Sequence, residues 1–276
     1  MAITTYDQLV AGLANSTPYT IAKASIATQG AGGFTSLWRA TGAPSQGAIP
    51  TVTGQSVIST LLGSLGTLSV ATSLTGYLAN FSVVGSISHQ IYAYDRLMHL
   101  GGLSGTASGA TALADCSVTA LSYYIDGSRG IATDCSNIEW WLDIYADIGT
   151  TARVITFTYT GPSASGQTCT LSYGGASPLN QDSRSFRILP AAGGSAICSI
   201  QSFSPAATTG TAGSWGITAR RRLTQINMGQ PNVGVDKDFA GIGMPTVYHN
   251  SCIEFLVLSS TTSSGVIDGW VNVIRG

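Results

Sequence analysis

The clearest alternation of apolar and polar residues lies between residues 137 and 160. One face of its first half would carry large apolar side chains, at Ile138, Trp140, Leu142 and Ile144, and the second half repeats the pattern at Ile155, Phe157 and Tyr159. A period of two is typical of strands with one buried and one exposed face. A turn at residues 147–151 would join the two strands, so the pattern predicts a β-hairpin.

Similar short segments, rich in β-branched and aromatic residues and separated by Gly, Ser and Asn, recur through the rest of the chain. They lie near residues 84–94, 118–125, 168–173, 184–189, 196–204, 214–223, 252–259 and 266–274. Many short strands with few helices favour a sandwich or a jelly roll. We therefore expect a mainly β fold, with a β-sandwich or jelly-roll-like domain over residues 57–276.

The first 56 residues follow a different pattern. Thr5 and Gln8 have the spacing of a capping box before apolar residues at helical spacing, which predicts a short helix over about residues 5–15. Residues 28–56 are rich in Gly, Pro, Ala and Ser, which favours an extended arm. Its large apolar side chains, Phe34, Leu37 and Trp38, would anchor the arm on a partner.

Charged residues make up only 9% of the chain, and the formal net charge is −1, whereas ordinary domains carry about 25% charged residues. Much of the surface is therefore expected to be covered by partners. Ten of the twelve basic residues are Arg, which suits interfaces, although a genome that favours Arg codons would give the same count. A pI near 6.2 without a dense basic stripe argues against nucleic-acid binding.

Four arginines are candidates for contacts with a partner: Arg39 in the arm, Arg96 at a strand end, and Arg220 and Arg222 on one face of a basic run. The alternative for the basic run is a solvated strand edge whose charges prevent aberrant pairing.

No arrangement of side chains predicts catalysis, a cofactor or a metal site. Asp95 and His99 would share a face of a strand, but fixing the strand end is the simpler role for that acid. Glu139 and Asp143 would lie about 13 Å apart on a strand, beyond the roughly 9.5 Å limit for inverting glycosidases. The five cysteines have no C-x-x-C spacing, so we expect free buried thiols in a reducing cytoplasm.

A charge-free stretch separates Arg39 from Asp95, but Gly, Ser, Gln and Asn interrupt every apolar run in it. A membrane span is therefore not expected. The first residues, MAITTYD, have neither a basic region nor an apolar run, so no signal peptide is expected either.

Three segments, in this order, form a further pattern: residues 93–106 (AYDRLMHLGGLSGT), residues 141–152 (WLDIYADIGTTA) running into 156–160 (TFTYT), and residues 209–218 (TGTAGSWGIT). Together they resemble the capsid cement or decoration proteins of tailed phages. The resemblance covers roughly residues 70–225. It implies a non-enzymatic virion protein, made in the cytoplasm of the host bacterium, that binds the major capsid protein and itself, often as a homotrimer. The inserts around Cys135 and Cys169 depart from the pattern.

Two other functions are compatible with the sequence. The chain could be a different virion component, such as a tail, neck or major capsid subunit, although a major capsid protein of the common tailed-phage fold would need a long spine helix. It could also be a carbohydrate-binding β-sandwich, because its five Trp and eleven Tyr residues could stack on sugars.

Overall fold

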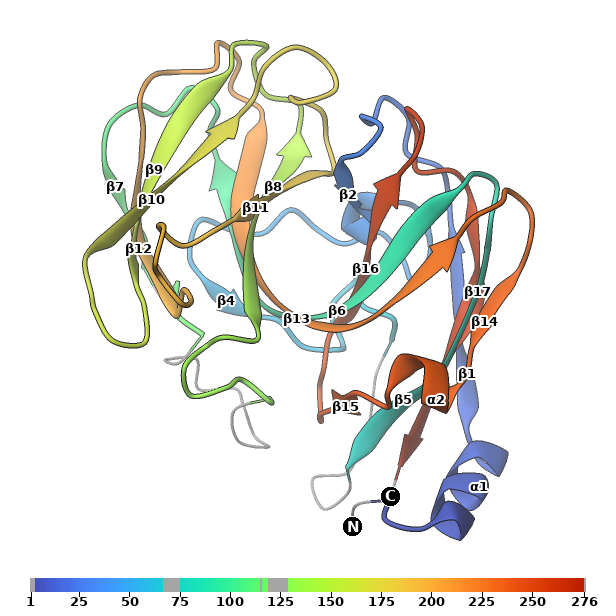
Figure 1. The fold of residues 1–276 in the computed structure, drawn as a ribbon. Helices are drawn as coiled ribbons and strands as arrows, with labels where there is room; N and C mark the ends of the chain where they lie inside the picture. Colours follow the sequence, from blue (N-terminus) through green and yellow to red (C-terminus); the bar gives the residue numbers. More distant parts are fainter. Residues whose placement is uncertain (1–2, 67–74, 115, 119–128, 276) are drawn as a thin grey trace.

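Three β-sheets form the framework of the protein in the computed structural model, which describes residues 3–66, 75–114, 116–118 and 129–275 (Figure 1). Sheet A has the strand order β14 (Val235–Lys237), β5 (Gly76–Gly85), β17 (Ile267–Arg275), β1 (Thr17–Lys23) and β3 (Gly42–Ala43), with β15 (Thr246–Val247) also paired to β5. Sheet C has the order β10 (Gln167–Tyr173), β9 (Arg153–Thr160), β12 (Ser199–Pro205) and β7 (Thr111–Ala112).

Sheet B joins the two halves of the molecule and closes into a ring. Its order is β13 (Ser214–Met228), β8 (Ile138–Ala146), β11 (Arg184–Ile188), β2 (Phe34–Ser36), β16 (Ile253–Ser259), β6 (His89–Leu103) and β4 (Gln55–Ser56). Because β13 also pairs with β6, the first six strands form a closed circuit. The long strands β6 and β13 run from the half with sheet C to the half with sheet A (Figure 1).

Two apolar cores lie on the outer side of this ring. Alternate residues of β8 and of the first part of β13 pack against sheet C, as Trp140 and Ile217 illustrate. Alternate residues of β16 and of the later part of β13 pack against sheet A, as Phe255 and Ile226 illustrate. The mainly β sandwich architecture predicted from alternation is therefore confirmed.

The predicted N-terminal helix is also confirmed. Helix α1 (Tyr6–Ala14) begins after the N-cap Thr5, and both bonds of the capping box are present with Gln8. The described ranges also contain two shorter helical turns, the 3-10 turn η1 (Leu37–Arg39) and α2 (Phe239–Ile242).

The hairpin predicted over residues 137–160 is wrong, although its two strands exist. β8 pairs with β11 and β13 in sheet B, whereas β9 pairs with β10 and β12 in sheet C. The two strands turn their apolar faces toward one another across a shared core. Alternation identified the apolar face of each strand, but it contains no information about which edge finds a partner. The opposite face of β8, which a period of two predicts to be exposed, is buried as well, at Trp141, Asp143 and Tyr145.

Residues 1–56 are not an arm that lies free of the folded body. β1 is hydrogen-bonded between β17 and β3, and β2 lies between β11 and β16 in the ring. Leu37 and Trp38 are buried within the protein. A division of the chain into two domains at residue 56 stays a prediction.

Candidate functional site: a partner-contact surface

Two of the four candidate arginines lie inside the ring of sheet B, not on its surface. The side chains of Arg96 and Arg220 are fully buried. β13 is hydrogen-bonded on both sides, so Arg220 is not on a free strand edge. The expectation that these two residues face a partner is therefore wrong for this fold.

A four-membered ionic network explains how both charges are tolerated there. Arg220 Nη2 donates to Asp143 Oδ2 at 2.7 Å, Arg220 Nη1 donates to Asp143 Oδ1 at 3.1 Å, and Arg220 Nε donates to Glu254. Arg96 Nη1 donates to Glu254 Oε2 at 2.7 Å. Two cations thus face two carboxylates, which is the pairing that buried charges require.

Neighbouring polar groups complete the network. Arg96 Nη2 donates to Tyr145 Oη at 2.7 Å, and Thr218 Oγ1 donates to Asp143 Oδ2 at 2.7 Å. Burial alone would raise the pKa of Asp143, but Arg220 and Arg96 outweigh burial and lower that pKa to about 2. Burial likewise opposes the charge of Arg220, but Asp143 and Glu254 raise its pKa above the ordinary value. Asp143 and Arg220 are therefore both charged at neutral pH.

Asp95 and His99 point to different environments, so the shared face expected for them is wrong. Asp95 contacts Arg129 and Arg221 and accepts from Ser251 Oγ at 2.8 Å. His99 Nδ1 accepts from Arg96 in the ring interior. The register of β6 against β13 shifts beside Arg96, and this bulge reverses the alternation between residues 95 and 99.

The three predicted anchors pack inside the protein. Trp38 donates from its indole nitrogen to Ala48 O at 2.9 Å, and the Arg96 guanidinium lies 4.2 Å from the Trp38 ring centre. Phe34 is half-buried and meets Trp141 edge to face at 4.9 Å. Leu37 is buried in the core under sheet A. These side chains anchor the N-terminal segment on its own fold.

Arg39 and Arg222 remain within reach of a partner. Arg39 is half-buried and donates to Gly47 O at 2.5 Å, whereas Arg222 is exposed and donates to Gln225 Oε1 at 2.6 Å. Their role in binding stays a prediction.

An apolar hollow of about 310 Å³ opens above Trp38 and is a feature that the residue patterns did not single out. Its walls include Ile49, Leu61 and Leu62, whose side chains are 40%, 39% and 61% exposed. These residues belong to the charge-free stretch between Arg39 and Asp95. The absence of charge in that stretch was the sequence feature that could have indicated the hollow, because an uncharged segment that is not wholly buried leaves apolar side chains at the surface.

The folded protein has even fewer surface charges than its composition suggests. Among the residues that the structure describes, nine charged side chains are buried, more than a third of the 12 basic and 13 acidic residues in the sequence: Lys23, Asp95, Arg96, Arg129, Asp143, Arg184, Arg220, Arg221 and Glu254. Large apolar side chains are exposed at the same time, among them Val52 at 59% and Leu189 at 58%. Electrostatic repulsion therefore opposes contact between this surface and another apolar surface only weakly.

Cys135 and Cys198 form a disulfide, so the expectation of five free thiols is wrong for this pair. Cys116, Cys169 and Cys252 are free and buried, as expected. In the part of the chain that the structure describes, no cluster of three or more His, Cys, Asp and Glu could hold a metal ion. Nor does any helix among those residues have the length and apolarity to cross a membrane.

Comparison with known proteins gives weak results. No family model matches the chain, and no curated protein matches it significantly. Among solved structures, the VP2 subviral particle of infectious bursal disease virus has a TM-score of 0.18 and 10% identity, over 95% of this chain and 81% of VP2. T=1 particles derived from the same virus give a TM-score of 0.17 and 9% identity, over 94% and 77% of the two chains. Scores this low carry no argument about fold or function.

Proposed function

We propose that the chain is a structural protein of a phage virion, of the capsid cement or decoration type, which binds other copies of itself and the major capsid protein. The observation that carries the proposal is the surface, which combines few charges with an exposed apolar hollow at Ile49, Leu61 and Leu62. Isolated soluble proteins avoid such a surface, whereas subunits of an assembly cover it.

The hollow above Trp38 fits a second copy of this chain. Its apolar lining suits an apolar side chain of a neighbour, and a formal net charge of −1 opposes self-association only weakly. The cement role and the homotrimer rest on the three segments that resemble tailed-phage decoration proteins. The major capsid protein would then contact another face, for which exposed Arg222 and half-buried Arg39 are candidates.

The rigid interior suits a structural role. Buried hydrogen-bonded charges, such as Arg220 and Asp143, hold one strand arrangement in place because any slip would leave them unpaired. The Cys135–Cys198 disulfide would persist on a particle after release from the host, where conditions are oxidising. Assembly in the host bacterial cytoplasm would come first.

Sedimentation of the purified protein tests the self-contact. We expect an oligomer, and we expect Leu62→Asp to shift it toward monomer, because a carboxylate in the contact would be desolvated. Leu189→Asp is the matched control, since Leu189 is 58% exposed and does not line the hollow. A wild-type protein that stays monomeric at high concentration would contradict the self-contact.

Location in the virion needs a second experiment. Particles of the phage that encodes the chain are labelled with an antibody against it and imaged by negative stain. Label over the head, together with binding of added protein to heads that lack it, supports the cement role. Label on the tail or neck would assign it to another virion component, and unlabelled particles would overturn the proposal.

A further inference from the structure

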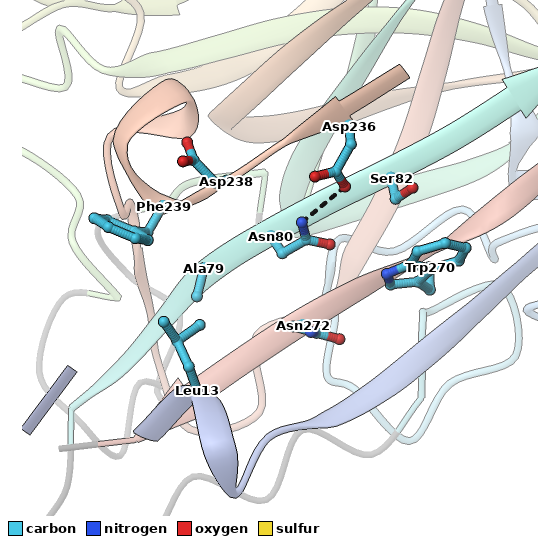
Figure 2. A pocket seen from close by; sticks show the side chains of 9 residues that line it. All are labelled: Leu13, Ala79, Asn80, Ser82, Asp236, Asp238, Phe239, Trp270 and Asn272. Carbon is cyan, nitrogen blue, oxygen red and sulfur yellow. Dashed lines mark hydrogen bonds between the residues drawn. The ribbon is translucent and has the colours of Figure 1, made fainter. Parts of the chain in front are cut away.

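A second hollow, of about 580 Å³, lies on the outer face of sheet A (Figure 2) and shares no lining residue with the hollow above Trp38. Its floor is formed by side chains of β5, β14 and β17, and its rim includes Leu13 from α1 and Phe239 from α2. The opposite face of the same strands, which includes Phe81 and Val271, is buried in the core. The strands therefore present their polar face to the hollow.

The register of the three strands arranges these side chains in two rows. Ser82 on β5 lies opposite Trp270 on β17 and opposite Asp236 on β14, which gives the first row. Asn80 lies opposite Asn272 in the second row. With strands about 4.8 Å apart and about 6.7 Å between alternate residues, the two rows span about 10 Å by 7 Å. That area is comparable to one or two hexose rings.

Trp270 is the unusual residue of this surface. The chain has five Trp residues, and the other four, at positions 38, 140, 141 and 215, are at most 2% exposed. Trp270 is 47% exposed, and its indole borders the row of polar groups (Figure 2). An exposed indole provides a flat apolar surface on which a partly apolar ligand can stack.

The polar groups beside Trp270 are partly held in place and partly unsatisfied. Asn80 Nδ2 donates to Asp236 Oδ1 at 2.8 Å, which fixes the orientation of the Asn80 amide. The side-chain oxygens of Asn80 and Asn272 accept no hydrogen bond from the described residues, although both atoms are buried. Leaving a buried acceptor unsatisfied is unfavourable. A hydroxyl donor that reached the Asn272 oxygen after a small rotation of that side chain would satisfy it.

We infer that this hollow binds a neutral carbohydrate. The apolar face of a pyranose ring would stack on Trp270, and its hydroxyls would bond to Asn80, Asn272 and Asp236, since hydroxyls both donate to carboxylates and amide oxygens and accept from amide nitrogens. None of the described residues that line the hollow is basic, and two are aspartates, so an anionic ligand is disfavoured. This inference is independent of the assembly contact proposed above.

The test begins with the full chain on a printed array of neutral gluco-, galacto- and manno-oligosaccharides, followed by calorimetry with the sugars that bind. We expect Trp270→Ala to weaken binding by about tenfold or more, because the stacking surface is lost. Trp270→Phe keeps an aromatic ring and should retain part of the affinity. Leu189→Ala, which removes an exposed apolar side chain elsewhere, should bind as wild type does.

Acrylamide quenching gives a second readout that does not depend on calorimetry. Because Trp270 is exposed and the other Trp residues are buried, the quenchable fluorescence should come from Trp270 and be absent in Trp270→Ala. A bound oligosaccharide should protect it. The inference is overturned by an array without hits, by wild-type affinity in Trp270→Ala, or by protection that depends on protein concentration and not on sugar, which would indicate a second copy on this face.

Discussion

Arg220→Ala offers the most direct test of the ring interior. The substitution removes both hydrogen bonds to Asp143 and the bond to Glu254, and it leaves two buried carboxylates with Arg96 as their nearest cation. Arg222→Ala is a closely matched control, because Arg222 lies two residues further along β13 with an exposed side chain. The two variants lose the same chemical group from different environments.

The burial of Arg220 determines how much stability the substitution should cost. Removing one partner from a buried ion pair costs about 3–5 kcal/mol, since the remaining charge is left desolvated, whereas an exposed arginine contributes about 0–1 kcal/mol. For a chain of this length, 3–5 kcal/mol corresponds to a fall in Tm of roughly 5–9 °C. Arg222→Ala should lower Tm by roughly 2 °C at most.

Urea and thermal unfolding followed by tryptophan fluorescence would measure both effects, because Trp141 and Trp38 lie beside the network. A further variant sharpens the reasoning. Replacing Arg220 by Met and Asp143 by Leu together leaves Arg96 paired with Glu254 at 2.7 Å, so the double variant should cost less than the sum of its single variants. Losses below about 1 kcal/mol in Arg220→Ala would refute the assignment of a buried network.

Acid unfolding adds an independent check on the same residue. The folded pKa of Asp143, about 2, lies below its ordinary value of 3.8. The stabilisation from this carboxylate is therefore present above about pH 4 and is lost as the pH falls toward 2. Arg220→Ala removes the largest influence that lowers this pKa, so the variant should unfold at a higher pH than wild type. An unchanged acid midpoint would contradict this account.

Three further predictions concern other parts of the molecule. Cys135→Ser opens a disulfide whose cysteines are 63 residues apart, so it should cost about 4 kcal/mol in denaturant unfolding, whereas loss of a free thiol in Cys169→Ala should cost clearly less. Burial lowers the pKa of His89 from 6.5 to about 4, so stability should fall between pH 6.5 and 4 as the unfolded chain takes up the proton, and His89→Phe should flatten that dependence. Arg39→Ala and Arg222→Ala should each reduce the amount of protein bound to phage heads, while the far-UV circular dichroism spectrum stays unchanged. If both variants bound heads as well as wild type does, the capsid contact would lie elsewhere.

Alternation is a local property, so the sequence allowed many of the longer strands and the apolar face of each to be predicted. It missed β1, and it did not reveal that the second face of β8 is buried too. The strand predicted near residues 118–125 lies, apart from residue 118, outside the described residues. Alternation predicted that Trp140 and Ile144 share an apolar face, and both lie in the core between sheets B and C. Pairing was not predictable in the same way. β8 finds its partners at residues 184–188 and 214–221, far along the chain, and nothing within residues 137–160 encodes that choice.

The arginines were misplaced for a related reason. Arg220 lies on the polar face of an alternating strand, and a polar face is normally taken to be solvated. Here that face points into a closed ring, where Asp143 and Glu254, from β8 and β16, neutralise it. The partners are 77 and 34 residues away in sequence, so a single-chain pattern could not reveal the pairing.

The closed ring also explains why so little charge remains outside. Six strands enclose a space in which aromatic side chains such as Trp141 and Tyr145 pack beside Arg96 and Arg220. The long guanidinium side chains fill volume as well as pairing with carboxylates, which an aliphatic side chain could not do. Because the chain has only 12 basic and 13 acidic residues, each ion pair placed in this interior removes charge from a surface that has little. On a surface with so few charges, electrostatic repulsion and charge solvation do little to oppose apolar contacts such as those at Leu61 and Leu62.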